Sequence, residues 1–368
     1  MGECIGLDFG TTYSSISHLT KMRKTSDGVE MELEAVEIDN QEAIESVVVE
    51  DDKGTVHFGT DARDYNGVGN AKTFKGFKML LGETRTEILN KHGFEIDQPE
   101  KITEQYLSNL ISTYLESNNE PIDALVVGIP EVWNKTAIAS RNKLLSILEK
   151  IIGLGKVKVE SEPVLASAFF AFKHKEKTGK DFTGKILLID YGGGTLDISL
   201  CDVQKDKPIY IDYKTGVGEA EHTKLGDAGF AYLEAVVKEA IGKAFTGEKD
   251  SDFYECMYKV EDALIKKSSE VTKHLKAILK GIKKEYDITL FPRPLSYHGN
   301  EYPVTYKMLI DVYNNTIHPV LEVYLNRVGD ELTKRGIDYR DPLSDSFRIA
   351  IVGGFGNFYL VQNQISLI

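Results

Sequence analysis

The feature that most constrains this chain is a short pattern that occurs twice. Residues 6–12 read Gly-Leu-Asp-Phe-Gly-Thr-Thr, and residues 188–195 read Leu-Ile-Asp-Tyr-Gly-Gly-Gly-Thr. In each copy a hydrophobic strand leads into an aspartate, which is followed by an aromatic residue, glycine and threonine, and then by a second strand. The first copy stands at the start of the 368 residues and the second near the midpoint. Such a repeat predicts two similar lobes, each beginning with a strand–turn–strand unit. Chance recurrence is the weaker interpretation, because the flanking strands also match.

Length, charge and cysteine usage exclude several classes of protein. The chain is too long for a single ordinary hydrophobic core. Its composition, 42% hydrophobic and 27% charged residues, is typical of a globular protein. The net charge of −13 argues against a nucleic-acid partner, because phosphate backbones require clustered Lys and Arg. We find no apolar run of the roughly 20 residues that span a bilayer, no secretory leader and no CxxC pair. We therefore expect a cytoplasmic protein with no membrane partner and no disulfide framework.

Hydrophobic periodicity predicts the elements between the two copies of the pattern and after them. A hairpin is expected over residues 47–58, with a polar tip, and a short β element over 288–304. Within a mostly helical stretch, 229–282, we expect Val271, Leu275 and Leu279 to be buried. The remaining predictions are helices over 101–117 and 135–152 and strands over 123–130, 186–190 and 348–352.

The two glycine turns carry the chemistry that the residues alone suggest. Glycine lets backbone N–H groups approach a phosphate closely, and aspartate supplies the hard oxygen that Mg²⁺ prefers. Asp8 precedes Gly10-Thr11-Thr12, and Asp190 precedes Gly192-Gly193-Gly194-Thr195, with Asp197 as a further carboxylate. Either turn alone could be a tight hairpin beside a solvated aspartate, but their pairing favours a phosphate site. The Walker loop, the dinucleotide fingerprint, HExxH and the GxSxG elbow are all missing.

Residues 5–14 and 188–197 resemble the two phosphate motifs of DnaK-type heat-shock chaperone ATPase domains, members of the actin, hexokinase and heat-shock ATPase superfamily. The resemblance continues in the family's order through residues 46–49, 78–82, 128–130, 133–134, 162–163 and 352–354. It implies an α/β, two-lobed actin-like ATPase fold in which each lobe is a ribonuclease H-like domain with an inserted subdomain. The implied lobes are 1–180, with an insert at about 36–105, and 181–368, with an insert at about 229–305. Mg–ATP would lie in the cleft between them.

The resemblance also assigns roles to individual residues. Lys78 would contact the γ-phosphate, Glu162 would position the attacking water, and Asp8 and Asp190 would organise hydrated magnesium. This division is physically sensible, because phosphoryl transfer depends mainly on orientation and charge stabilisation. Without the resemblance, Lys78 would be interpreted as a solvated cation and Glu162 as a carboxylate at a helix N-terminus. The implied catalytic set is Lys78, Glu162, Asp190, Thr195 and Asp197. The implied cofactor-binding residues are Gly10, Thr11, Thr12, Tyr13, Gly192, Gly193, Gly194, Thr195, Glu270, Lys273, His274, Gly353, Gly354 and Phe355.

The nucleoside end departs from the family pattern. Where the family has a small hydroxyl residue and then arginine after the late Gly-Gly, this chain has Phe355 and Asn357. In the helical insert the family has Glu, then Lys and Arg three and four positions later, then Ser seven positions later. The best register places Glu270 and Lys273 at the first two positions, whereas His274 and Ala277 stand where the family has Arg and Ser. The two-arginine clamp on the base is therefore not visible. The base could stack on Phe355 or His274, or Phe355 could simply pack in the core.

The leading expectation is an ATP-binding, slowly ATP-hydrolysing domain of a DnaK-type chaperone-like protein, using ATP or ADP with Mg²⁺. The alternatives are a nucleotide-responsive binding module with little turnover, a kinase on the same superfold and an actin-like filament protein. The resemblance implies a J-domain protein and a nucleotide exchange factor as possible partners. The family's peptide-binding domain is not contained in this sequence, so we expect either a piece of a longer protein or an ATPase-only relative.

Overall fold

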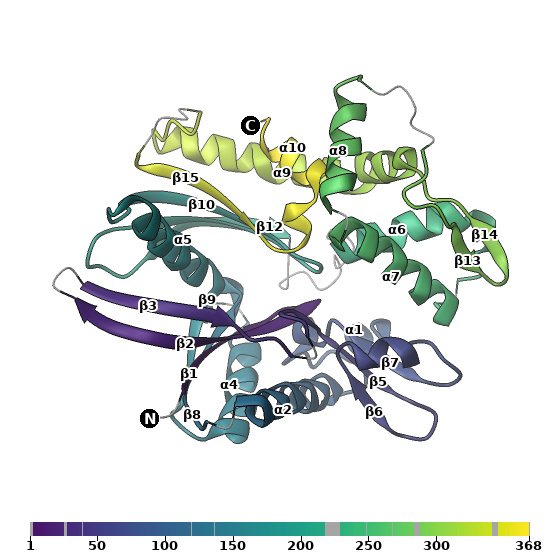
Figure 1. Cartoon of the computed structure of the whole chain (residues 1–368), viewed down its shortest axis with the longest axis horizontal. Coiled ribbons are helices and arrows are strands. Elements are labelled where there is room, and N and C mark those ends of the chain that lie inside the picture. The colour runs from purple at the N-terminus through teal and green to yellow at the C-terminus, as the bar shows by residue number, and fades with distance from the viewer. Residues whose placement is uncertain are drawn as a thin grey trace. The chain divides into compact units, whose positions relative to one another are not determined.

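The computed structural model describes residues 3–25, 28–38, 40–118, 120–135, 137–217, 229–247, 249–266, 268–282, 288–340 and 345–367 (Figure 1). The chain divides into two compact units, unit 1 (Met1–Leu165) and unit 2 (Ala166–Ile368), and each is described by itself. The mixture of helices with several sheets fits the expected actin-like ATPase fold.

Unit 1 is built on a mixed sheet that begins with the first copy of the repeat. The sheet order is β3-β2-β1-β8-β9, with a short strand β4 paired to β2. Strand β1 is antiparallel to β2 and parallel to β8, which is parallel to β9. Ile5, Leu7 and Phe9 alternate into the core, so the intervening Asp8 lies on the other face of β1. The strands are β1 (Glu3–Phe9), β2 (Tyr13–Thr25), β3 (Gly28–Ala35), β4 (Ile44–Glu45), β8 (Ile122–Ile129) and β9 (Val157–Ser161).

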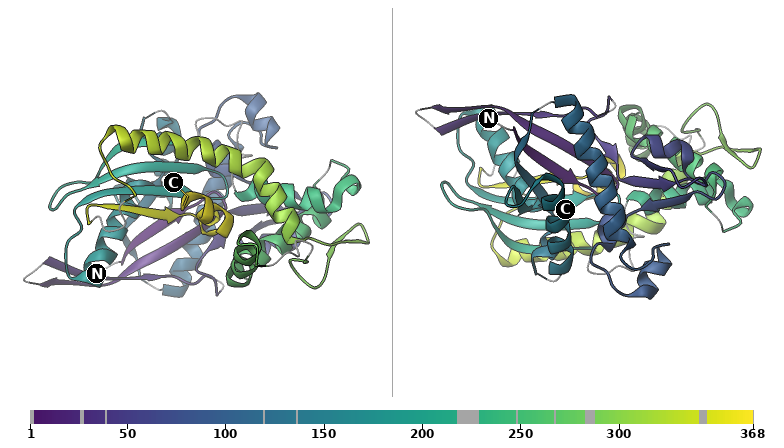
Figure 2. Two further views of the ribbon diagram at one scale, coloured as in Figure 1. Left: turned by 90° about the horizontal axis from the view of Figure 1, so that it is seen from above. Right: turned by 90° about the horizontal axis from the view of Figure 1, so that it is seen from below.

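The helices of unit 1 bury the apolar side of this sheet. In α2, the predicted helix, Ile102, Tyr106, Leu110 and Tyr114 recur every four residues and are buried. Helix α2 packs against α4, and the right view of Figure 2 shows it lying across strands of the sheet. The helical elements are η1 (Asp61–Tyr65), η2 (Phe77–Leu80), α1 (Thr86–Lys91), α2 (Gln98–Asn118), α3 (Glu131–Lys135), α4 (Ile138–Ile152) and α5 (Glu162–Thr178), the last of which continues into unit 2.

A second, smaller sheet in unit 1 contains the predicted hairpin. Strands β5 (Val47–Glu50) and β6 (Val56–Phe58) pair antiparallel, and β7 (Lys72–Lys75) pairs with the other edge of β5. Asp51 closes the hairpin tip, because its carboxylate accepts the backbone N–H groups of Lys53 and Thr55. The hairpin prediction is confirmed.

Unit 2 repeats the opening arrangement of unit 1. Its sheet order is β12-β11-β10-β15, and β10 has an antiparallel neighbour in β11 and a parallel neighbour in β15. Strand β1 has the same two kinds of neighbour, so each copy of the repeat forms the predicted strand–turn–strand unit beside a parallel strand from later in the chain. The strands are β10 (Gly184–Tyr191), β11 (Leu196–Val203), β12 (Tyr210–Val217) and β15 (Phe347–Val352).

Helices make up most of the rest of unit 2. The long α9 begins at a Thr305 cap, whose hydroxyl accepts the N–H of Met308, and Figure 2 shows it extending along the sheet. Helix α6 packs on both α7 and α9. The elements are α6 (Gly229–Ile241), η4 (Gly242–Ala244), α7 (Ser251–Lys266), α8 (Ser268–Leu279), β13 (Leu295–Tyr297), β14 (Asn300–Tyr302), α9 (Tyr306–Lys334), η5 (Phe355–Asn357) and α10 (Tyr359–Ile365).

Two local predictions are confirmed with adjusted bounds, and one was wrong. The helix expected over 135–152 is α4, which begins three residues later, at Ile138. The short β element expected over 288–304 is present as the hairpin β13–β14 and a bridge between Thr289 and Thr305. Leu279 is 43% exposed, whereas Ile278 is buried, because the buried stripe of α8 continues from Leu275 by three residues rather than four.

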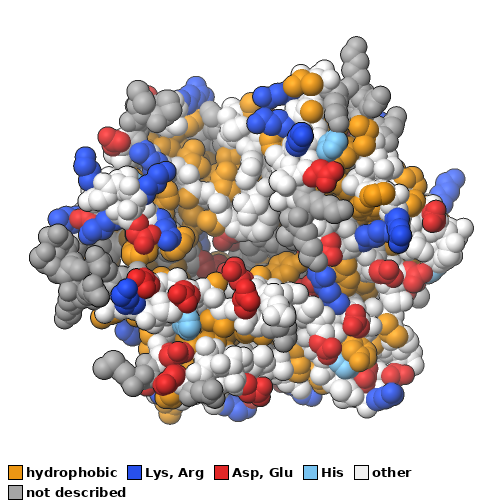
Figure 3. Space-filling view, in the orientation of Figure 1, with side chains coloured by type: hydrophobic (Ala, Val, Ile, Leu, Met, Phe, Trp, Pro, Cys, Tyr) orange, Lys and Arg blue, Asp and Glu red, His pale blue; other side chains and the backbone are white. Residues whose placement is uncertain are grey.

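The surface carries charges of both signs. On the face that Figure 3 shows, acidic and basic side chains are interspersed. Among the residues that the structure describes, no helix combines the length and the apolar character needed to cross a membrane.

Candidate functional site

The first glycine turn joins β1 to β2 and admits no side chain at Gly10. A Cβ placed on Gly10 would lie 2.0 Å from the carbonyl oxygen of Tyr13. Ser46 fixes the turn from outside: its hydroxyl donates to the Gly10 carbonyl at 2.7 Å and its N–H donates to the Thr12 carbonyl at 2.8 Å. The Ser14 hydroxyl lies 2.9 Å from that of Ser46. No local sequence pattern predicts this supporting role of Ser46, because the role depends on a contact 36 positions away.

The threonines of this turn, Thr11 and Thr12, are both half-buried. The Thr11 hydroxyl lies 3.5 Å from the sulfur of Met79. Tyr13 begins β2 and pairs with Glu45 of β4. The turn is therefore held by the short strand β4 and by Ser46, which directly follows it.

Lys78 is buried, which the sequence pattern alone did not favour. It lies in η2, where Gly76 takes a positive φ of 67° just before the helix and all four helical residues are buried. Its side chain is 5% exposed, and Nζ lies 2.8 Å from Oε1 of Glu162. The ammonium group also lies 5.9 Å from the ring centres of Phe9 and Trp133. A buried lysine requires such a partner, because an unpaired charge is costly to remove from water.

Glu162 is positioned by a glycine in the neighbouring strand. It is the first residue of α5, where a carboxylate interacts favourably with the helix dipole. Gly128 of β8 lies directly under it, because a Cβ on Gly128 would be 3.1 Å from Cγ of Glu162. A side chain at position 128 would therefore push Glu162, and with it the partner of Lys78.

Asp8 lies near the same two charged groups. Its side chain is accessible to water, yet protein atoms surround it densely enough to oppose ionisation. This burial raises the pKa of Asp8, the Glu162 carboxylate raises it further, and the Lys78 ammonium lowers it. Unit 1 thus brings together a glycine turn, a buried cation and two carboxylates.

The second glycine turn, in unit 2, places two carboxylates opposite each other. Asp190 of β10 and Asp197 of β11 are directly paired across the antiparallel ladder, so their side chains share one face of the sheet. Gly353 follows β15 with a φ of 81°, and a Cβ there would lie 2.6 Å from Oδ1 of Asp190 and 2.5 Å from the Tyr191 carbonyl. The glycine is required both for its backbone conformation and for its contact with the aspartate.

The backbone of this second turn is tied to the start of α6. The Gly192 N–H donates to the Thr195 carbonyl at 3.0 Å, which closes the turn. The N–H groups of Gly229 and Phe230 donate to the carbonyls of Gly192 and Gly193. Gly194 is buried and Thr195 is half-buried. The turn over residues 192–195 is therefore closed by its own backbone and joined by hydrogen bonds to the start of α6.

Phe355 packs against the core of unit 2. Its ring contacts Tyr191 edge-on at 5.0 Å between centres and stacks with Phe358 at 5.8 Å. It also packs against Tyr232, and a Cβ on Gly229 would approach the phenylalanine within 2.9 Å. Of the two roles left open by the sequence, these contacts favour packing. The neighbouring Gly354 is exposed.

The three residues aligned in the helical insert lie on α8. Glu270 and Lys273 are exposed, and His274 is half-buried and stacked on Tyr306 at 5.1 Å. Burial raises the pKa of Tyr306 to about 12, and the Glu270 carboxylate contributes to this increase. His274 is therefore already occupied by an aromatic contact within its own unit.

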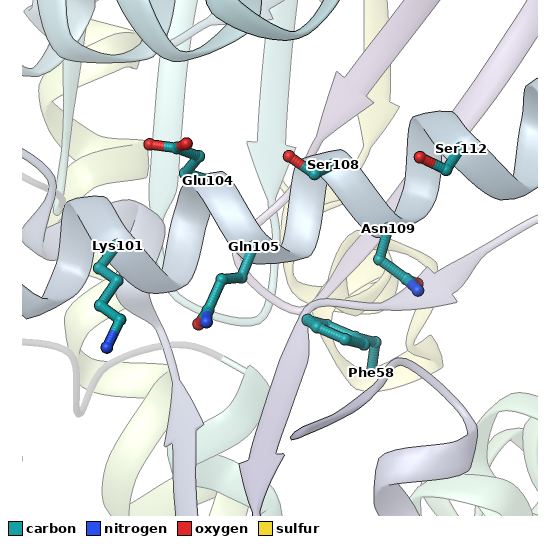
Figure 4. A pocket seen from close by; sticks show the side chains of 7 residues that line it. All are labelled: Phe58, Lys101, Glu104, Gln105, Ser108, Asn109 and Ser112. Carbon is teal, nitrogen blue, oxygen red and sulfur yellow. The ribbon is translucent and has the colours of Figure 1, made fainter. Parts of the chain in front are cut away.

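Unit 1 also contains a shallow groove away from these residues. Its volume is about 570 Å³, and it lies between α2 and Phe58 of β6. Figure 4 shows Gln105 and Asn109 directed toward the side where Phe58 lies. The groove contains none of the predicted site residues. Among the residues that the structure describes, no cluster of three or more His, Cys, Asp or Glu side chains could hold a metal ion.

Comparison with known proteins supports the resemblance seen in the motifs. A chaperone protein DnaK from Mycoplasmoides gallisepticum is 28% identical over 207 residues, which are 55% of this chain and 31% of that protein. A chaperone protein HscA homologue from Rickettsia typhi is 26% identical over 229 residues, covering 55% of this chain and 33% of that protein. These similarities suggest the DnaK-type heat-shock ATPase family.

A third relative extends the similarity over more of the chain. An iron–sulfur cluster biogenesis chaperone of mitochondria from Saccharomyces cerevisiae is 23% identical over 355 residues, covering 86% of this chain and 50% of that protein. The matches span a third to a half of the length of these relatives. No family model matches the chain.

Proposed function

We propose that this chain is the ATP-binding, slowly ATP-hydrolysing domain of a DnaK-type chaperone-like protein. The observation that carries the proposal is the buried Lys78 ammonium, held 2.8 Å from Glu162 beside Asp8 and the Gly10 turn. A cation held in a protein interior next to a glycine turn is suited to offset the charge that develops on a transferred phosphoryl group. The names of the similar proteins, all chaperones, support the assignment.

The proposal gives each group of residues a distinct task. The backbone of the turns at Gly10–Tyr13 and Gly192–Thr195 contacts phosphate oxygens, with the threonine hydroxyls as further donors. Lys78 exchanges part of its contact with Glu162 for the γ-phosphate. Glu162 then accepts a hydrogen bond from the attacking water and orients it. Gly353 and Gly354 approach the nucleotide beyond Asp190, and Asp197 completes the polar network.

The carboxylates present fit a magnesium ion. Mg²⁺ is usually held by one or two carboxylates together with water and phosphate oxygens, so a full protein cage is not required. Asp8 meets this description because burial and Glu162 oppose its ionisation, and a bound cation would relieve both effects. Asp190 also fits, because Asp197 lies directly opposite it. Bound magnesium would neutralise phosphate charge.

The finer architecture belongs to the same proposal. The sheet orders β3-β2-β1-β8-β9 and β12-β11-β10-β15 support a ribonuclease H-like core in each half. The proposed lobes are 1–180 and 181–368, each with its insert. We also propose a cytoplasmic location. The proposed partners are a J-domain protein and a nucleotide exchange factor.

A single-turnover assay tests the assignment of the catalytic residues. Excess protein is mixed with labelled ATP, and phosphate release is followed for the parent chain, Lys78→Ala and Glu162→Ala, with and without Mg²⁺. We expect each substitution to slow release by roughly a hundredfold, as for removal of a group that stabilises the transition state. Lys173→Ala is the matched control, because Lys173 forms an exposed ion pair with Glu176 at the same 2.8 Å.

The outcomes of this assay decide between the proposal and one of its alternatives. Equal rates in all variants, or rates that do not depend on Mg²⁺, would reject the assignment. Binding of ATP without phosphate release from any variant, including the parent chain, would favour a nucleotide-responsive module with little turnover.

A further inference from the structure

A histidine in the small sheet of unit 1 has two acidic partners that the proposed function does not use. His57 lies in β6, directly after the polar hairpin tip, and its side chain is 11% exposed. Its Nδ1 lies 3.0 Å from Oδ2 of Asp61, in η1, and its Nε2 lies 3.2 Å from Oδ2 of Asp51, at the hairpin tip. The imidazole therefore connects two elements, with one nitrogen toward each.

Both sides of this contact are fixed by further interactions. The second oxygen of Asp51 accepts the N–H groups of Lys53 and Thr55, so this carboxylate is part of the hairpin turn. The imidazole ring stacks on Tyr65, at the end of η1, with ring centres 3.5 Å apart and planes 13° apart. The ring is thus held in the orientation that directs its two nitrogens at the two carboxylates.

The number of N–H donors on the imidazole determines which charge state of the ring fits its two carboxylate partners. A carboxylate only accepts hydrogen bonds, and neutral imidazole has one N–H to donate. Neutral His57 can therefore satisfy only one of its two partners, whereas the imidazolium form donates to both and carries the complementary charge. Burial lowers the pKa of His57, but the hydrogen bonds to Asp61 and Asp51 outweigh it, and the net pKa lies above the ordinary 6.5. Within the described residues, the groups that face the ring are Asp51, Asp61 and Tyr65.

We propose that His57 is a protonation-dependent clamp that joins the β5–β6 hairpin to η1. When the ring is charged, the clamp is closed at both nitrogens. When the ring is neutral, one contact is lost and the hairpin opens more readily. Phe58 follows His57 in the same strand and lines the groove beside α2 (Figure 4), so the state of the clamp affects one wall of that groove.

The direction of the pH effect follows from linkage. A group whose pKa is higher in the folded state stabilises that state fully below its unfolded pKa of about 6.5. This contribution disappears as the pH rises through the higher folded value. The hairpin is therefore expected to loosen on the alkaline side of neutrality.

An NMR titration of the His57 ring between pH 5.5 and 9 tests the proposal directly. We expect a midpoint above 6.5 that moves down in Asp61→Asn, a substitution at an exposed side chain that leaves the fold intact. Hydrogen-exchange protection of the Gly54 and Thr55 amides, corrected for intrinsic exchange, should fall by about threefold to tenfold across the same midpoint. His57→Gln should remove this pH dependence.

His298 provides the matched control. It lies at the β13–β14 hairpin of unit 2, 2.6 Å from Asp250 and stacked on Tyr297. His298→Gln should leave the protection of the Gly54 and Thr55 amides unchanged at every pH. A His57 midpoint at or below 6.5, a midpoint unaffected by Asp61→Asn, or protection that does not follow the titration would each overturn the clamp.

Discussion

Removing the charges of Lys78 and Glu162, singly and together, tests whether the buried cation depends on that carboxylate. The two charges lie 2.8 Å apart, with side chains 5% and 24% exposed. Breaking a buried ion pair costs about 3–5 kcal/mol, and the partial exposure of Glu162 reduces this. We therefore expect a coupling free energy of about 2 kcal/mol between Lys78→Met and Glu162→Gln, with the double variant more stable than the sum of the single losses predicts.

The chain offers a local probe for this measurement. Trp133 is the single tryptophan, it is buried in unit 1, and its ring lies 5.9 Å from the Lys78 ammonium. Urea unfolding of the ligand-free protein, followed by tryptophan fluorescence, gives the four free energies of unfolding of the cycle. The exposed pair Lys173–Glu176 has the same 2.8 Å separation and should show a coupling of only about 0.2–1 kcal/mol. If the Lys78–Glu162 coupling were as small as that of the exposed pair, the buried lysine would not depend on Glu162 and the reasoning would be refuted.

Three further predictions concern other parts of the molecule. Gly353→Ala should destabilise unit 2 by about 2–4 kcal/mol, because a positive φ and a contact with Asp190 are both violated; unchanged thermal unfolding would contradict this. Asp8→Asn should raise the unfolding temperature without Mg²⁺ at neutral pH, because the substitution removes a carboxylate whose pKa is raised by burial. The same substitution should weaken Mg–ATP binding. A lower unfolding temperature without Mg²⁺ would contradict the prediction. Hydrogen bonds from Arg85 lower the pKa of Glu83 to about 2, so its stabilising effect should be complete above about pH 4.5 and disappear toward pH 2. Acid unfolding profiles of the parent chain and Glu83→Gln that are parallel over this range would disprove that effect.

The parts of the fold that were predictable are those set by local pattern. The alternation of Ile5, Leu7 and Phe9 fixes which face of β1 is buried, and the glycine turn that follows can only be a hairpin. The same pattern in the second half predicts β10 and β11. In these segments the residue-to-residue contacts are short in sequence, so periodicity contains most of the information.

The parts that were not predictable depend on contacts between distant residues. Lys78 is interpreted as a solvated cation from its neighbours alone, and its burial depends on Glu162, which is 84 positions away. Ser46 holds the Gly10 turn for a reason that no local spacing encodes. The position of Phe355 was open for the same reason, because its aromatic neighbours come from β10, α6 and the segment before α10.

Titration calorimetry with ATP, ADP and GTP, each with and without Mg²⁺, tests the central claim most directly. The account predicts that ATP and ADP bind, that affinity falls when Mg²⁺ is removed, and that Asp8→Asn and Asp190→Asn both weaken binding of ATP with Mg²⁺. Absence of ATP binding under both conditions, or an affinity that neither Mg²⁺ nor these substitutions change, would contradict it.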